Sequence, residues 1–415
     1  MTIIRPFKAI RPVATHASDV AALPYDVMNT EEAREMVKGN PYSFLHIDKS
    51  EIDLPETVDH YSDEVYAKAK STLEEMKEKK IFMQDDTPKL YIYQLGMDGR
   101  TQTGLVVCTS VDEYLDNTIK KHEFTRAEKE ADRIRHVDVL NTQTGPIFLA
   151  YKEKASISNT IKTWMKDHKP VYDFKSEDAI SHRVWVIDNE STIASLVKNF
   201  DEVANFYIAD GHHRNASAAK VALKRREEKG ANFDQNAEFN FYLSVLFPDA
   251  ELKIMDYNRV VKDLNGLSQA DFMKKIEEKC SVSPAEMPIT SPEKLHNFHM
   301  YIDQKWYVLE MKKELISADP VDGLDVALLQ NEILQPILGI GDPRVDTRID
   351  FVGGIRGLSE LEKRVDSGEM AVAFAMFPTS MDELMAVADA NMVMPPKSTW
   401  FEPKLRSGLF LHDLG

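Results

Sequence analysis

The sequence predicts a mixed α/β (α+β) fold. Short apolar segments with strand character alternate with helical patterns between residues 147 and 261, as in proteins that pack helices against a sheet. Two further pairs of apolar segments are separated by only a few turn residues, which indicates β-hairpins rather than a purely parallel sheet. The chain has 415 residues, 43% of them hydrophobic, enough for two or three domains with cores of their own.

The N-terminal region is predicted to be irregular at first and helical later. Prolines interrupt regular structure repeatedly in the first sixty residues, because each restricts the residue before it. Residues 59–80 form the first predicted helix, since apolar residues recur there at helical spacing: Val65, Ala69, Leu73 and Met76. Residues 90–95 and 103–109 flank a glycine-containing turn, which predicts a β-hairpin.

The middle and the C-terminal part of the chain show regular alternation. The predicted helices cover residues 127–141, 157–168, 213–228, 268–280 and 322–338. The predicted strands cover 147–151, 184–187, 206–209, 241–247, 254–261 and 371–377, with a second hairpin from 300–303 and 306–311. Domain boundaries are expected near residues 85 and 262, which gives regions 1–84, 85–261 and 262–415.

Charge and composition exclude several classes of protein. The net charge is −17, from 51 basic and 68 acidic residues, and such a surface repels nucleic-acid backbones. The two cysteines, Cys108 and Cys280, do not form a disulfide framework, which fits a reducing compartment. The sequence has no signal-peptide pattern and no run approaching the ~20 apolar residues of a membrane span. We expect a cytoplasmic protein without a nucleic-acid or membrane partner.

The strongest chemical signal is the segment Asp210-Gly211-His212-His213-Arg214 between a predicted strand and an alanine-rich helix. Gly211 allows a sharp turn, and the helix N-terminus that follows attracts anions. Arg214 offers a fork of donors for phosphate oxygens, and the histidines can donate hydrogen bonds. Asp210 could hold Mg²⁺, orient a histidine or accept a proton. One alternative is an ordinary helix cap with surface histidines, and another is a metal site.

A second polar segment is Ile119-Lys120-Lys121-His122-Glu123, followed by Arg126, Asp132 and Arg133. His122-Glu123 is not part of a zinc-protease motif, because the second histidine at the required spacing is missing. Without further information, the start of a solvated, charged helix explains this segment equally simply.

Both segments resemble a known family. Residues 210–214 resemble the signature of the free-serine kinases of the ParB/sulfiredoxin-like superfamily, where the motif binds nucleotide phosphates. Residues 119–123 are similar to the Ile-Lys-Pro-His-Glu element of these kinases, with Lys121 in place of proline. The resemblance covers roughly residues 85–261. It implies a ParB/sulfiredoxin-like nucleotide-binding core with additional N- and C-terminal segments and an insertion at about 152–200.

The chain as a whole resembles a large bacterial and archaeal family described only as a domain of unknown function. This likeness runs from end to end. The matching features are Leu23-Pro24-Tyr25-Asp26-Val27, His122-Glu123 with Asp132-Arg133, Thr144-Gly145-Pro146-Ile147-Phe148, and Thr399-Trp400-Phe401-Glu402-Pro403-Lys404.

The kinase resemblance implies phosphoryl transfer from ATP or ADP, with Mg²⁺, to the hydroxyl of free L-serine, which yields O-phosphoserine. It implies that Glu123, Asp210 and His212 are catalytic, with Glu123 as the base. Gly211, His212, His213 and Arg214 are expected to bind the phosphates, and Asp210 the Mg²⁺. The residues expected to bind the amino acid are His122, Arg126, Asp132, Arg133 and Asp26.

Two other functions are compatible with the same residues. One is a ParB-like nucleotide-binding regulator without turnover, although the acidic charge argues against DNA association. The other is a metal-dependent hydrolase that uses Asp210, His212, His213 and His122 as ligands. Exposed hairpin edges would permit a homodimer in either case.

Overall fold

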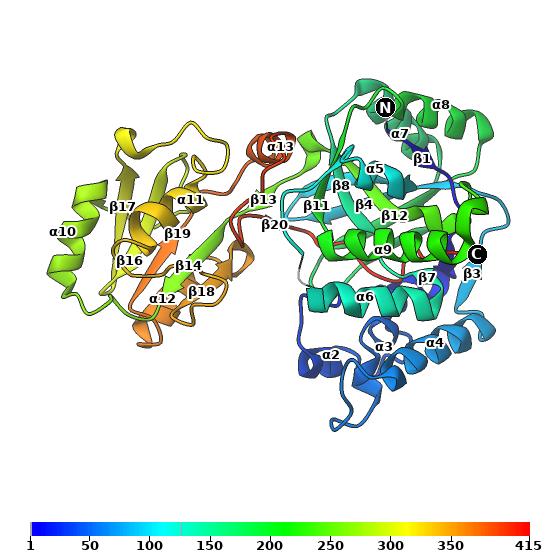
Figure 1. Ribbon diagram of the computed structural model, residues 1–415, viewed down its shortest axis with the longest axis horizontal. Helices are drawn as coiled ribbons and strands as arrows, with labels where there is room; N and C mark the ends of the chain where they lie inside the picture. Colours follow the sequence, from blue (N-terminus) through cyan, green and yellow to red (C-terminus); the bar gives the residue numbers. More distant parts are fainter. Residues whose placement is uncertain (1, 126) are drawn as a thin grey trace. The chain divides into compact units, whose positions relative to one another are not determined.

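The computed structural model describes residues 2–125 and 127–415. The described chain forms two compact units: unit 1 contains residues 1–252 and 403–415, and unit 2 contains residues 253–402 (Figure 1). Each unit combines a β-sheet with helices, so the predicted mixed α/β fold is confirmed. The two units differ from the three regions expected from the sequence, because residues 1–84 belong to the same unit as residues 85–252.

Unit 1 is built on a sheet that has nine strands within the described residues, in the order β6-β11-β8-β12-β5-β4-β10-β9, with β1 paired to β5. These strands are β1 (Ile4–Arg5), β4 (Leu90–Met97), β5 (Arg100–Ser110), β6 (Ile119–Lys120), β8 (Ile147–Tyr151), β9 (Tyr172–Lys175), β10 (Ser181–Ile187), β11 (Phe206–Asp210) and β12 (Phe241–Pro248). β4 and β5 form the predicted hairpin, whose two-residue turn places Asp98 and Gly99 at positive φ. β6 and β11 run parallel, as do β8 and β12.

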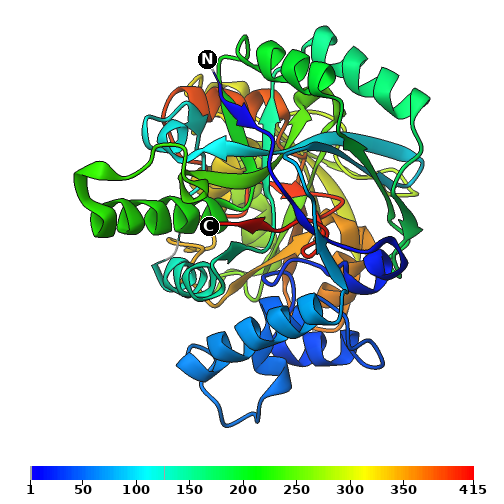
Figure 2. The same ribbon diagram turned by 90° about the vertical axis from the view of Figure 1, so that its right-hand side faces the viewer.

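Helices cover this sheet and supply its core. They are α5 (Val111–Leu115), α6 (Ala127–Leu140), α7 (Ala155–Asp167), α8 (Glu190–Phe200) and α9 (His212–Lys229). The alanines at 218, 219 and 222 let α9 pack closely, and they join a buried cluster with Ile147 and Ile208 of the sheet. α6 and α9 lie side by side in Figures 1 and 2.

The N-terminal helices form a second core in unit 1. They are α1 (Ala17–Val20), α2 (Thr30–Met36), α3 (Leu45–Asp48) and α4 (Asp63–Glu78), and the predicted helix at 59–80 is therefore confirmed. Phe44, Leu73 and Leu140 of α6 are buried together in this core with Leu411, which comes from the other end of the chain.

The C-terminal segment, residues 403–415, belongs to unit 1. Its strand β21 (His412–Asp413) pairs with β7 (Thr142–Gln143), and Leu411 bridges to Ile10 of β2 (Ile10–Pro12), which pairs with β3 (Phe82–Gln84). Figure 2 shows this segment (red) among the N-terminal strands (dark blue).

Unit 2 contains an antiparallel sheet with six described strands, in the order β15-β17-β16-β19-β14-β18, and the small sheet β13-β20. The strands are β13 (Ile254–Met255), β14 (Tyr257–Val261), β15 (Cys280–Pro284), β16 (Asn297–Ile302), β17 (Lys305–Met311), β18 (Ile349–Gly353), β19 (Val372–Ala375) and β20 (Trp400–Phe401). The helices are α10 (Gln269–Lys279), α11 (Asp325–Leu329), α12 (Leu358–Asp366) and α13 (Met381–Asp389). A π-helical turn, Gln330–Leu334, continues α11.

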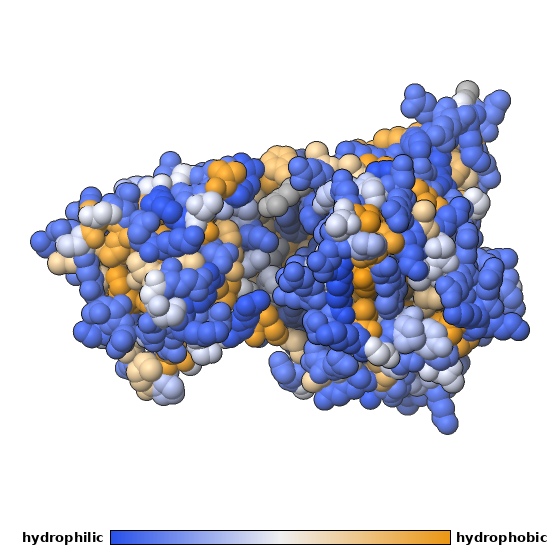
Figure 3. All heavy atoms as spheres, turned by 90° about the horizontal axis from the view of Figure 1, so that it is seen from below, coloured by the Kyte–Doolittle hydropathy of each residue, from blue (hydrophilic) through white to orange (hydrophobic). Residues whose placement is uncertain are grey.

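Polar and charged residues dominate the face seen in Figure 3, with smaller apolar patches between them. Within the described residues, no helix is long and apolar enough to cross a membrane.

Candidate functional site

The two polar segments singled out in the sequence leave the sheet of unit 1 at the same edge. β6 and β11 are parallel neighbours, with Ile119 paired to Phe206 and Lys120 to Tyr207. Parallel strands end on the same side of a sheet, so the residues after β6 and those after β11 come together. The result is a separation of 3.8 Å between Glu123 Oε2 and His212 Nδ1.

Gly211 forms the turn from β11 into α9. Its φ of +91° lies in the left-handed region, which glycine adopts without strain. A Cβ atom there would lie 3.7 Å from Ile147 Cα, an ordinary contact, so the backbone angle rather than space selects glycine. The first turn of α9 contains no acidic residue, which leaves the positive end of the helix dipole available to an anion.

Asp210 is held by a lysine from the C-terminal segment. Lys404 Nζ donates to Asp210 Oδ2 over 2.9 Å, and the Gly211 N–H donates to Oδ1 over 2.8 Å. Desolvation raises the pKa of Asp210, but Lys404, the Gly211 N–H and Arg214 together lower it, so the net pKa lies below its ordinary value. Lys404 had no predicted role, and its only signal in the sequence was its place in the family-like segment 399–404.

His122 and His212 form a buried pair. Their rings are perpendicular, with centroids 4.6 Å apart. Among the described residues, neither ring nitrogen of His122 nor Nε2 of His212 has a hydrogen-bond partner. Burial lowers the pKa of His122 to about 4 and that of His212 well below its ordinary value. Both rings are therefore neutral at pH 7 and can assist a phosphate only as hydrogen-bond donors.

Arg214 is directed toward the N-terminal helices. Its Nη2 donates to Asp48 Oδ2 over 3.1 Å and to Ser407 Oγ over 3.2 Å, and its guanidinium lies 5.1 Å from the centre of the Tyr25 ring. The side chain is only 14% exposed. Arg214 thus anchors the start of α9 to the N-terminal region. His213 is the second residue of the same helix, and its carbonyl accepts a hydrogen bond from Ser217 Oγ.

Asp48 is the buried centre of this anchor. It accepts hydrogen bonds from Arg214 and from Thr144 Oγ1, and Arg133 Nη1 lies 3.9 Å from its Oδ1. Burial raises the pKa of Asp48, but the nearby positive charges, that of Arg214 above all, bring it down to about 2. The carboxylate is fully enclosed and ionised, so its role is to fix the cations around it.

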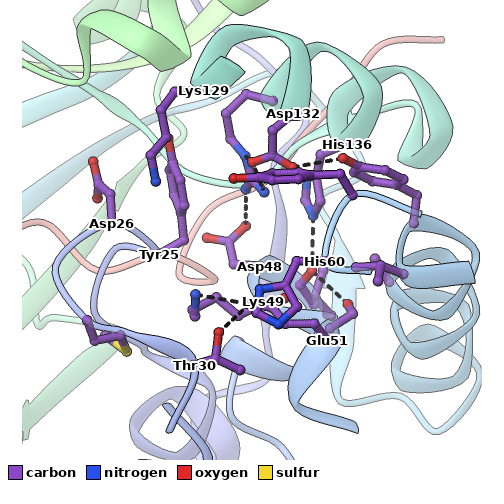
Figure 4. Close-up of a pocket in the computed structure, with 18 of the residues that line it drawn as sticks. Tyr25, Asp26, Thr30, Asp48, Lys49, Glu51, His60, Lys129, Asp132 and His136 are labelled. Carbon is purple, nitrogen blue, oxygen red and sulfur yellow. Dashed lines mark hydrogen bonds and ion pairs between the residues drawn. The ribbon is translucent and has the colours of Figure 1, made fainter. Parts of the chain in front are cut away.

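Three of the residues expected to bind the acceptor line one pocket of about 240 Å³: Asp26, Asp132 and Arg133. Figure 4 shows Asp132 and His136 of α6 on one side of this pocket and Thr30, Lys49 and Glu51 on the other. Asp132 accepts hydrogen bonds from Tyr66 and Arg133, while Lys49 Nζ lies 3.0 Å from Glu51 Oε1.

This pocket borders the 210–214 motif, because its wall includes Tyr25 and Asp48, which both contact Arg214. The pocket therefore combines charges of both signs next to the start of α9. Of the two remaining predicted acceptor residues, His122 does not line this pocket but lies after β6 in its pair with His212, and Arg126 lies outside the described residues.

The metal-site alternative finds no ligand set in the described part of the chain. No group of three or more His, Cys, Asp or Glu residues there could hold a metal ion. The two buried histidines, His122 and His212, face each other. The geometry therefore gives no support to a hydrolase that uses Asp210, His122, His212 and His213 as ligands.

Residues 4–327 match the family described as "Protein of unknown function (DUF1015)". The chain belongs to this family. The predicted family likeness is thereby confirmed over residues 4–327. A search of curated proteins finds no match.

Several solved structures are distantly similar. A free serine kinase variant in complex with AMP matches 73% of this chain and 91% of its own, with 12% identity and a TM-score of 0.37. A conserved hypothetical protein from Pyrococcus furiosus matches 75% of this chain and 97% of its own, with 16% identity and a TM-score of 0.35. SbnI from Staphylococcus aureus, with a C-terminal truncation, matches 74% of this chain and 87% of its own, with 11% identity and a TM-score of 0.38.

Proposed function

We propose that this protein is a small-molecule kinase that transfers a phosphoryl group from ATP or ADP to the hydroxyl of free L-serine. The observation that carries the proposal is the position of Glu123, whose carboxylate lies 3.8 Å from His212 at the N-terminus of α9. A carboxylate beside an anion-binding helix end is the pairing that phosphoryl transfer to a hydroxyl requires.

Glu123 is proposed as the general base. Its side chain is 51% exposed, so a substrate hydroxyl can reach it. As the hydroxyl oxygen forms a bond to the terminal phosphorus, Glu123 accepts the hydroxyl proton, and the bond from phosphorus to the bridging oxygen of the nucleotide breaks. The products are O-phosphoserine and the nucleotide shortened by one phosphate.

The start of α9 is proposed to bind the phosphates. The backbone after Gly211 and the rings of His212 and His213 supply donors, while the helix dipole stabilises the negative charge. Arg214 contributes by fixing the helix start through Asp48 rather than by direct contact.

Mg²⁺ would be held jointly by Asp210 and the nucleotide. The Asp210 side chain is 41% exposed, and its two oxygens keep lone pairs beyond those used by Lys404 and Gly211. When bound, the ion neutralises charge on the phosphates. Because one carboxylate is a weak site, the protein should bind Mg²⁺ appreciably only together with the nucleotide.

The pocket with Asp26, Asp132 and Arg133 is proposed to take the amino acid. Its volume of about 240 Å³ is below the roughly 300–1,000 Å³ typical of drug-sized ligands, which suits a small metabolite. Carboxylates and cations stand side by side in it, which matches the ammonium and carboxylate of a free amino acid.

The test is a product assay. The protein is incubated with Mg²⁺, ATP or ADP, and L-serine, L-threonine or L-homoserine, and O-phosphorylated product is measured by mass spectrometry. Glu123→Gln should lower kcat on the order of 100-fold or more with little change in nucleotide affinity. Glu227→Gln, at the exposed far end of α9, is the matched control. Nucleotide binding without product from any acceptor would instead favour a nucleotide-dependent regulator.

A further inference from the structure

The C-terminal segment, residues 403–415, contacts the phosphate-binding motif at two places. Lys404 Nζ binds Asp210 Oδ2 over 2.9 Å, and Ser407 Oγ accepts from Arg214 Nη2 over 3.2 Å. The segment follows unit 2 in the chain and lies beyond the family match, which ends at residue 327.

We infer that Lys404 is a positioning residue of the phosphate site: its ammonium orients and neutralises the Asp210 carboxylate, so that an anionic nucleotide can bind at the start of α9. The inference rests on the proposed function for the identity of the anion. It adds a residue from the opposite end of the chain to the site.

Electrostatics makes an uncompensated Asp210 unfavourable in this position. Asp210 is the last residue of β11 and immediately precedes Gly211, the cap of the helix whose N-terminus would meet the phosphates. A bare carboxylate there would repel the phosphate oxygens and cancel much of the attraction of the helix dipole. Lys404 removes that repulsion. Its side chain is only 13% exposed, while that of Asp210 is 41% exposed, so solvent screens the pair in part.

Other contacts hold the segment in place without Lys404. Leu411 exchanges backbone hydrogen bonds with Ile10, β21 pairs with β7, and Arg406 binds Asp178. Leu409, Phe410 and Leu411 are fully buried. The ammonium of Lys404 is thus not required for docking, which points to a role at Asp210 itself.

The experiment measures ADP binding by calorimetry at pH 7.5 in EDTA, so that Mg²⁺ does not contribute. Lys404→Met should weaken ADP binding on the order of 10-fold or more, and Lys404→Arg should retain most of it. The double variant Lys404→Met/Asp210→Asn should recover affinity relative to Lys404→Met, because the repelling charge is gone. Lys79→Met, which removes the cation of an exposed ion pair on α4, is the control.

Each possible result either supports or overturns the inference about Lys404. Recovery in the double variant supports the inference, whereas a merely structural lysine would lower the thermal midpoint and show no such recovery. Wild-type affinity in Lys404→Met would overturn it. If the wild-type protein binds ADP but forms no product from any acceptor, the kinase proposal is wrong. The inference about Lys404 is then still decided by the ADP affinities of the variants. A wild-type protein that binds neither ADP nor pyrophosphate overturns both.

Discussion

The guanidinium of Arg214 fills the space that Gly145 leaves open. A Cβ atom at residue 145 would lie 2.2 Å from Nη1 and 2.6 Å from Cζ of Arg214. Gly145 precedes β8 and Arg214 belongs to the first turn of α9, so two family-like segments meet here by direct steric contact. A side chain at residue 145 would force the guanidinium of Arg214 to move.

Replacing Gly145 by alanine should therefore displace Arg214 from Asp48. The loss of this buried contact, together with the overpacking, should cost about 2–4 kcal/mol of the free energy of unfolding. The free energy of unfolding is measured by denaturant titration. Gly341→Ala, where a Cβ would have no neighbour within 4 Å, is the control. Equal stabilities of the two variants would contradict the steric relationship.

The stability contributed by Asp48 should disappear in acid. Its pKa is about 2 in the folded protein, below the ordinary value of 3.8. A carboxyl whose folded pKa is depressed stabilises the protein above its unfolded pKa, and this contribution is lost as the pH falls through the folded pKa. Asp48→Asn should thus be less stable than wild type by about 2 kcal/mol at pH 6, with the gap closing between pH 4 and pH 2. If the difference in the free energy of unfolding between the two proteins does not change with pH, the charge of Asp48 does not stabilise the fold.

The buried His122 should make the protein sensitive to mild acid. The pKa of His122 in the folded protein, about 4, is below its ordinary value of 6.5, so the unfolded chain takes up the proton first. Stability should fall as the pH drops from 6.5 to 4, by up to about 3 kcal/mol from this residue. His122→Phe should flatten that part of the curve, and the exposed His60→Phe should not. If the stability of wild type and of His122→Phe falls with pH in parallel, His122 is not the group whose protonation destabilises the protein.

The proposed amino-acid pocket should discriminate by both charged ends of the ligand. L-serine should bind, while L-serine amide and N-acetyl-L-serine, which lack the carboxylate and the ammonium respectively, should bind at least 10-fold more weakly. Asp132→Asn should remove the preference for the free ammonium, because Asp132 is a carboxylate in the pocket wall. Titration calorimetry without nucleotide measures all three ligands. Equal affinity for serine and its N-acetyl derivative would place the acceptor elsewhere.

Local sequence patterns predicted the elements that carry the site. The strand expected at 206–209 and the helix at 213–228 correspond to β11 (Phe206–Asp210) and α9 (His212–Lys229). The helix α13 (Met381–Asp389) was missed although its Ser380–Glu383 capping box is a local signal. α8 (Glu190–Phe200) was missed as well, although its Asn189 cap and the buried Leu196 and Phe200 are local signals.

The contacts that complete the site could not be predicted in the same way. Asp48 and Arg214 are 166 positions apart, and Lys404 and Asp210 are 194 positions apart. An ion pair at that separation leaves no periodicity or spacing in the sequence, and any of the many charged residues could have been the partner. Tertiary packing alone selects Asp48 and Lys404, through the docking of the N-terminal helices and of the C-terminal segment.

The return of residues 403–415 to unit 1 has a consequence for synthesis on the ribosome. Residues 1–252 emerge first and can begin to fold, but Lys404 follows only after residues 253–402 have been translated, roughly 8–30 s later at ordinary elongation rates. During that interval β7 lacks its partner strand and Asp210 lacks its lysine. A nascent chain therefore carries Asp210 without its counter-charge, and the proposed nucleotide site is completed only after residues 403–415 have docked.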